Sequence, residues 1–120
     1  MEIEDVRRFA LTLPGTTEEP HFELQSFRVG RKLFATWPSD GLRMHIFLDE
    51  AQTYAAVASA PAWTEELWWG KRLVGVRILL DGPSPGDVRA LLVAAWCRKA
   101  PRRVVAVFGQ SHPADVNPLR

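Results

Sequence analysis

The segment Leu67–Leu80, LWWGKRLVGVRILL, places two tryptophans before a glycine and two cations, and a run of branched aliphatic residues after them. An earlier segment, Phe27–Phe34 (FRVGRKLF), repeats this pattern: GRKL at 30–33 aligns with GKRL at 70–73, and cations are exchanged only for cations. A type II′ turn requires glycine at the first central position of a two-residue loop. The sequence therefore predicts two short β-hairpins, each with a type II′ turn and a positively charged tip.

Helix and strand signals surround the two hairpins. Apolar spacing predicts helices over 2–13, 51–58 and 85–99, with Asp49 and Ser84 as N-caps of the last two. Strands are expected over 21–29, 32–37, 42–48 and 72–80, with one more leading into the second hairpin, while 16–20 has the character of a polar loop. The order α-β-β-β-α-β-β-α predicts an α+β domain, a single antiparallel sheet of about five strands with about three helices packed on one face. This domain is expected over residues 1–103, followed by a partly flexible C-terminal extension over 104–120.

Alternation of apolar and polar residues predicts one buried and one open face of the sheet. The apolar residues expected to face the helices are Leu42, Met44, Ile46, Val74, Val76 and Ile78. The polar residues expected on the open face are Arg28, Arg43, His45 and Arg77. Such a face would suit an anion or a partner protein, and it would also serve simply as a solvated surface.

The whole-chain composition is that of a soluble globular protein. The 120 residues are 47% hydrophobic and 24% charged, and the net charge of +1 excludes the strongly basic signature of a dedicated nucleic-acid binder, though not a local basic patch. A single cysteine, Cys97, cannot form an internal disulfide, and no apolar run is long enough to cross a membrane. We therefore expect a cytoplasmic protein, a monomer with no membrane association.

The five tryptophans divide into two groups, Trp37 with Trp96 and Trp63 with Trp68 and Trp69, and the second group could stack on nucleic-acid bases. Trp37 and Trp96 are expected in the core. Trp68 and Trp69 are adjacent in a strand and must face opposite sides, so one is expected to be buried and the other partly exposed. An exposed Trp69 beside the second tip could stack on a nucleic-acid base.

Catalytic and metal-binding patterns are weak. His21, His45 and His112 lack a partner at metal-ligand spacing, and a triad of Ser26, His45 and an aspartate has no supporting motif. The first helix offers only a thin acidic ridge for iron. The expectation is a protein that is not an enzyme, with no catalytic residues, no metal site and no cofactor.

Five short motifs resemble the MmcQ/YjbR family over about residues 1–103. They are LPG at 13–15, Pro20 with Phe22, VGRKLFAT at 29–36, WWGKRLVGVRI at 68–78 and AWCRKAPRR at 95–103. The resemblance implies a compact α+β fold similar to that of frataxin. It also implies DNA binding, because the hairpins of the family resemble the double-wing motif of a phage transcription factor. The chain departs from the family at Glu23, where many members have glycine.

The first functional hypothesis is DNA binding without sequence preference. The cations Arg31, Lys32, Lys71 and Arg72 would contact phosphates on either side of a groove, since phosphate contacts give affinity without reading sequence. The other residues assigned to this surface are Arg28, Arg43, Arg77 and Trp69. The alternative is a non-catalytic protein- or small-anion-binding module that uses the open sheet face. In a third interpretation, the tip cations only keep the hairpins soluble.

Overall fold

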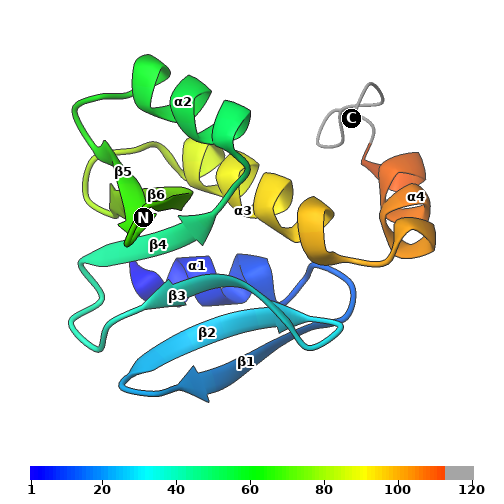
Figure 1. The fold of residues 1–120 in the computed structure, drawn as a ribbon. Helices are drawn as coiled ribbons and strands as arrows, with labels where there is room; N and C mark the ends of the chain where they lie inside the picture. Colours follow the sequence, from blue (N-terminus) through cyan, green and yellow to red (C-terminus); the bar gives the residue numbers. More distant parts are fainter. Residues whose placement is uncertain (113–120) are drawn as a thin grey trace.

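The computed structural model describes residues 1–112, which form an α+β fold with one antiparallel sheet (Figure 1). The predicted class is confirmed, and the sheet has six strands rather than about five. Residues 113–120 lie outside the described part, and so does that portion of the predicted extension. The elements in order are α1 (Ile3–Ala10), β1 (Thr16–His21), β2 (Leu24–Val29), β3 (Lys32–Trp37), β4 (Arg43–Phe47), α2 (Glu50–Ser59), β5 (Thr64–Trp69), β6 (Arg72–Leu79), α3 (Pro85–Lys99) and α4 (Arg102–Ser111).

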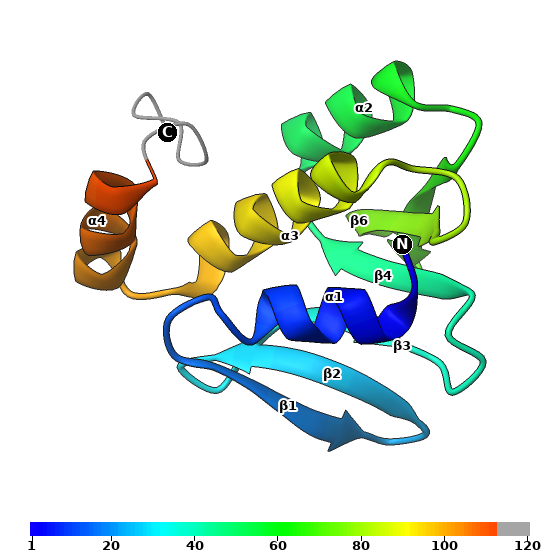
Figure 2. The ribbon, with the colours of Figure 1, turned by 180° about the vertical axis from the view of Figure 1, so that it is seen from behind.

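The strands follow the order β1-β2-β3-β4-β6-β5, and each neighbouring pair is antiparallel. Both predicted hairpins are present, as β2–β3 and β5–β6. Figure 2 views the sheet from the side that α1 and α3 cover. The strand β4 joins the two hairpins, because it pairs with β3 on one side and with β6 on the other.

Capping residues fix where the two middle helices begin. The Asp49 carboxylate accepts a hydrogen bond from the Gln52 backbone N–H at 2.7 Å, and α2 starts at the next residue. Ser84 caps α3 in the same way through Asp87, with Pro85 at the first helical position. The predicted N-caps are confirmed.

Two elements were not expected from the sequence. The segment predicted as a polar loop is β1, an edge strand that pairs with β2 from Thr16↔Val29 to His21↔Leu24. The run within the predicted C-terminal extension forms α4, whose Phe108 is 7% exposed and contacts Trp96 with ring centroids 4.9 Å apart. Both elements depend on pairing or packing with another element more than on their own sequence pattern.

Register shifts alter which side chains share a face of the sheet. The β2–β3 pairing shifts between Phe27 and Arg28. After the shift, Lys32 pairs with the buried Val29, so Lys32 extends to the helix side of the sheet. A second shift between Leu67 and Trp68 interrupts the β5–β6 pairing.

The buried face agrees with the predicted alternation at most positions. Met44, Ile46, Val76 and Ile78 are at most 1% exposed, and Trp37 and Trp96 lie in the core as expected. Leu42 is an exception at 64% exposure, because it lies in the turn before β4 rather than in the strand.

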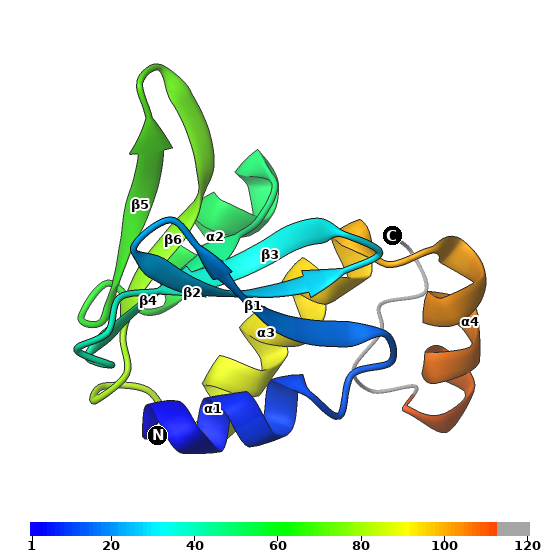
Figure 3. The same cartoon turned by 90° about the horizontal axis from the view of Figure 1, so that it is seen from below.

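The expectation for the adjacent tryptophans was wrong. Trp68 is 47% and Trp69 51% exposed, so neither is buried. The β5–β6 hairpin extends beyond the helices, as Figure 3 shows, and neither of its faces is fully covered there.

Truncation of Trp96 tests the core. Trp96 is fully buried, and its indole N–H donates a hydrogen bond to the Pro14 carbonyl at 3.1 Å. Trp96→Ala should lower the free energy of unfolding by about 3–5 kcal/mol. Urea denaturation measures the loss, and Trp68→Ala is the control, expected to cost much less because Trp68 is half exposed. Equal losses for the two variants would contradict the packing described.

Candidate nucleic-acid interface

The two basic tips lie at the same end of the strands of the sheet. The first turn lies between Val29 and Lys32, and the second between Trp69 and Arg72. Since β3 and β6 both run antiparallel to β4, both strands begin at the end of the sheet where β4 finishes. The sheet is strongly twisted, so the β5–β6 tip rises away from the sheet while the β2–β3 turn points sideways (Figure 3).

The two turns differ in conformation. Gly70 alone has positive φ in the second tip, at 60°, as the predicted type II′ turn requires. In the first tip both central residues have positive φ, with Gly30 at 56° and Arg31 at 68°. That combination belongs to a type I′ turn, so the type II′ prediction is wrong for this hairpin. Positive φ is costly for a residue with a side chain, so Arg31 occupies a strained position.

The four tip cations are exposed. Arg31, Lys32, Lys71 and Arg72 all have solvent-exposed side chains. The ion pairs found in residues 1–112 use other arginines, namely Arg7, Arg8 and Arg77. The tips therefore present cations that no carboxylate in the described part neutralises.

Aromatic side chains distinguish the second tip from the first. The Trp69 ring contacts the buried Phe47 edge-on, with centroids 5.2 Å apart, and leaves half of its surface in solvent. The Trp68 indole N–H donates to a Glu66 carboxylate oxygen at 3.0 Å. Two half-exposed indoles thus precede Lys71 and Arg72, which combines stacking surface with positive charge.

A row of polar side chains crosses the open face. Cross-strand partners place Ser26, Thr36, His45, Arg77 and Glu65 side by side over five strands. The Arg77 guanidinium forms an ion pair with Glu65 at 2.5 Å and donates from Nε to His45 Nε2 at 3.3 Å. The Ser26 hydroxyl donates to the Glu19 carbonyl at 2.7 Å and is fully buried, so it is not placed as a nucleophile.

The remaining arginines predicted for the open face also lie there. Arg28 contacts His21, with its Nη2 at 3.0 Å from Nδ1, and its Nη1 donates to the Arg31 carbonyl at 3.2 Å. Arg43 is exposed and lines a hollow beside Trp63. Because Arg77 is paired with a carboxylate and Arg28 with an imidazole, the open face is less available to an anion than its sequence suggested.

The hydrogen bond from Arg77 sets the state of His45. A guanidinium only donates, so His45 Nε2 must accept and the proton lies on Nδ1, which faces the Thr36 hydroxyl at 3.4 Å. Burial lowers the pKa of His45 below its ordinary 6.5, the charge of Arg77 lowers it further, and Glu65 opposes both. His45 is therefore neutral in its folded environment near pH 7.

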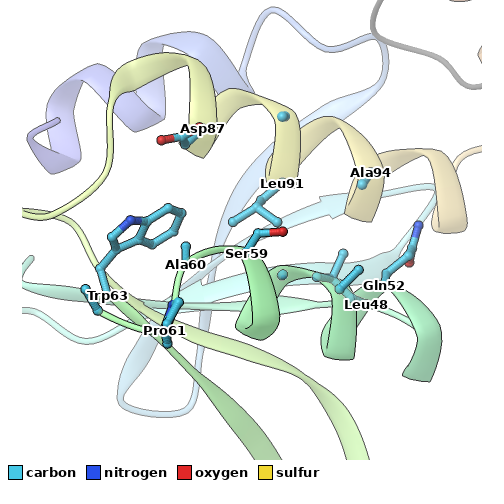
Figure 4. Close-up of a pocket in the computed structure, with 13 residues that line it drawn as sticks. Leu48, Gln52, Ser59, Ala60, Pro61, Trp63, Asp87, Leu91 and Ala94 are labelled. Atoms are coloured by element: carbon cyan, nitrogen blue, oxygen red, sulfur yellow. The ribbon is translucent and has the colours of Figure 1, made fainter.

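An apolar groove lies on the helix side, between α2 and α3 (Figure 4). Its volume is about 720 Å³, much of its lining is alanine, and Trp63 stands at one end. Two of its polar side chains are engaged in helix capping, since Gln52 accepts from the Asp49 N–H and Asp87 from the Ser84 N–H. The groove offers no cation, so it is distinct from the basic tips.

Two further observations concern the part of the chain that is described. Across residues 1–112, no three His, Cys, Asp or Glu side chains gather closely enough to hold a metal ion. None of the helices in that range has the length and apolar character needed to cross a bilayer.

The sequence analysis missed four cations near the first tip: Arg98, Lys99, Arg102 and Arg103. They flank the connection between α3 and α4. The pKa of Lys99 is lowered by burial and by the positive charges of Arg98 and Lys32. Lys99 thus lies close enough to the β2–β3 hairpin for the charge of Lys32 to act on it. The signal that could have revealed these cations is the absence of any acidic residue over 88–112.

His45 gives the fold a pH dependence with a defined sign. A base whose pKa is lowered by folding stabilises the protein above its unfolded pKa of about 6.5, and this contribution is lost as the pH falls toward the lower folded value. Between about pH 7.5 and 5, the wild type should therefore lose more free energy of unfolding than His45→Gln, which cannot titrate. Denaturation at the two pH values measures the difference. Identical losses would show that folding does not lower the pKa of His45.

Comparisons with known proteins place these features in a family. The family model of YjbR matches residues 11–98. The crystal structure of Deinococcus radiodurans protein DR2400, described as a DUF419 domain, is similar in fold, with a TM-score of 0.70, 21% sequence identity and coverage of 90% of this chain and 88% of that chain. The comparison with curated proteins gave no match. Because the matched segment contains all six strands and all but the last residue of α3, this chain belongs to the YjbR family.

Proposed function

We propose that this YjbR-family domain binds nucleic acid through its phosphates, without sequence preference, using the two hairpin tips. The observation that supports this most is the placement of four exposed cations, Arg31, Lys32, Lys71 and Arg72, at one edge of the sheet. Cations on two separated tips can contact phosphates on either side of a groove, which gives affinity and register but no base reading.

The two tips contribute differently. The first holds Arg31 at a φ of 68°, a strained conformation that glycine would adopt at lower cost. The presence of a cation at this strained position is better explained by function than by stability. The second tip adds the half-exposed Trp69, whose indole can lie against a base or sugar while Lys71 and Arg72 contact phosphates.

The other arginines assigned to this surface have supporting roles. Arg28 donates to the Arg31 carbonyl and so holds the strained turn. Arg43 and Arg77 lie on the open face, where their charge adds to the field that attracts a polyanion. Their contribution to affinity should be smaller than that of the tip cations.

The alternative function uses the open face alone to bind a small anion or a protein. The Arg77–Glu65 ion pair and the neutral state of His45 weaken this hypothesis. Exposed Arg43 is the residue on which such a site would depend. Arg43→Glu therefore separates the alternative from the proposal.

A salt titration with duplex DNA tests the proposal. Four phosphate contacts predict a slope of about −3.6 for log affinity against log salt, or about a 150-fold loss between 50 and 200 mM. Fluorescence anisotropy with a labelled 20-bp duplex measures the slope. Salt-independent binding, or no binding at high micromolar protein in 50 mM salt, would overturn the proposal.

Charge reversal assigns the binding to the tips. Arg31→Glu combined with Lys71→Glu should remove most of the affinity and flatten the slope, while the free energy of unfolding changes by at most about 1 kcal/mol per site. Arg43→Glu is the control and should have a smaller effect. If only Arg43→Glu abolishes binding of the duplex, the open face is the functional surface instead.

A further inference from the structure

The net charge of +1 conceals a strong separation of charge. Residues 24–39 and 88–112 contain eight of the 15 basic side chains and none of the 14 acidic ones. The rest of the chain therefore holds seven basic and 14 acidic side chains. Local charge of this kind is a better guide to a polyanion surface than the net charge of the whole chain.

The fold brings one part of each segment together at one end of the molecule. Figures 1, 2 and 3 agree that the β2–β3 turn, the C-terminal end of α3 and the connection to α4 lie at the same end. The α1–β1 loop also lies there, since the Trp96 indole near the end of α3 donates to the Pro14 carbonyl, and residues 9–17 contain no acid.

Lys32 and Lys99 connect the hairpin to the helix. Lys32 pairs with the buried Val29 and so extends to the helix side of the sheet. Burial lowers the pKa of Lys99 most, and the positive charges of Arg98 and then Lys32 lower it further, so the hairpin cation acts on the end of α3. Arg98 precedes Lys99 in α3, and Arg102 and Arg103 begin α4 three residues later; all three side chains are exposed.

Stability does not explain this arrangement. Arg98 and Lys99 suit the negative end of the α3 dipole, but Arg102 and Arg103 occupy the first turn of α4, where cations are unfavourable. The N-cap of that helix is Pro101, which supplies no side-chain cap. Two cations at the positive end of a helix dipole lower the stability of the fold in the absence of an anion.

We infer that these six cations, Arg31, Lys32, Arg98, Lys99, Arg102 and Arg103, form one phosphate-binding surface, the basic corner, which continues from the first hairpin tip onto the α3–α4 connection. The identity of its ligand rests on the proposed function, binding of a nucleic-acid backbone. A strand that contacts the β2–β3 tip would continue across the helices, so this side of the interface would contact more phosphates than the β5–β6 tip does.

Neutralisation of two arginines tests the corner against a matched control. Arg102→Gln with Arg103→Gln removes two charges from the corner, while Arg8→Gln with Arg89→Gln removes two from the region of α1 and the start of α3. In the duplex titration between 50 and 200 mM salt, the first pair should flatten the slope by about 1.8 and the second should leave it unchanged. The unfolding midpoint of the Arg102/Arg103 variant should stay the same or rise, because two cations leave the positive end of a helix dipole.

The outcomes separate the corner from the tips. If the tip charge reversals flatten the slope and the Arg102/Arg103 variant does not, the corner is overturned and the tip proposal stands. If the Arg102/Arg103 variant flattens the slope and Lys71→Glu alone does not, the corner stands and the β5–β6 tip lies outside the interface, so the two-tip proposal fails. Equal flattening by both glutamine pairs would show an effect of net charge and overturn the corner. Binding of the wild type to phosphatidylserine vesicles but not to duplex would show a membrane surface and overturn a nucleic-acid ligand.

Discussion

The arrangement of both hairpins depends on the close contact between β4 and β6 at Gly75. A Cβ atom at this position would lie 2.0 Å from the Ile46 carbonyl oxygen, so no other residue fits without moving the strands apart. Gly75 pairs with Phe47 at the point where β4 ends. The ladder formed there holds two separate hairpins in one sheet and places their turns at a common edge. An interface made of exposed cations is thus positioned by a buried glycine between β4 and β6.

Local signals in the sequence were sufficient for a large part of the fold. The glycines of the two turns, the alternation along β4 and the N-caps Asp49 and Ser84 act within a few residues of themselves, so they could be recognised without knowing the fold. The edge strand β1 could not be, because its residues are mostly polar and only pairing with β2 makes it a strand. Helix α4 likewise depends on Phe108 packing against Trp96, a contact between separate helices.

In the candidate site, too, some residues could be predicted from local sequence and others only from the packing of separate elements. The four tip cations could be named from the sequence because the turn that exposes them is a local feature. Their neighbours could not, since Lys99 reaches Lys32 only through the packing of α3 on the sheet. The tryptophan prediction failed for a related reason: strand alternation fixes which way Trp68 and Trp69 point, but only the tertiary structure shows that helices do not cover this hairpin. The partners of Arg77 and Arg28 on the open face also depend on strand register.

Separation of charge within a nearly neutral chain has consequences for how such a domain meets a polyanion. At physiological salt, fields are screened beyond about 8 Å, so a net charge of +1 gives little attraction at long range. At contact distance, the cations of the basic corner and of the β5–β6 tip attract phosphates, while the 14 acidic side chains, all outside residues 24–39 and 88–112, repel them. The domain would therefore bind in one orientation, through the hairpin edge and the basic corner, even without recognising any base. A protein that binds in this way contacts the phosphate backbone in a fixed orientation without recognising bases. Its opposite surface then remains accessible to a second molecule.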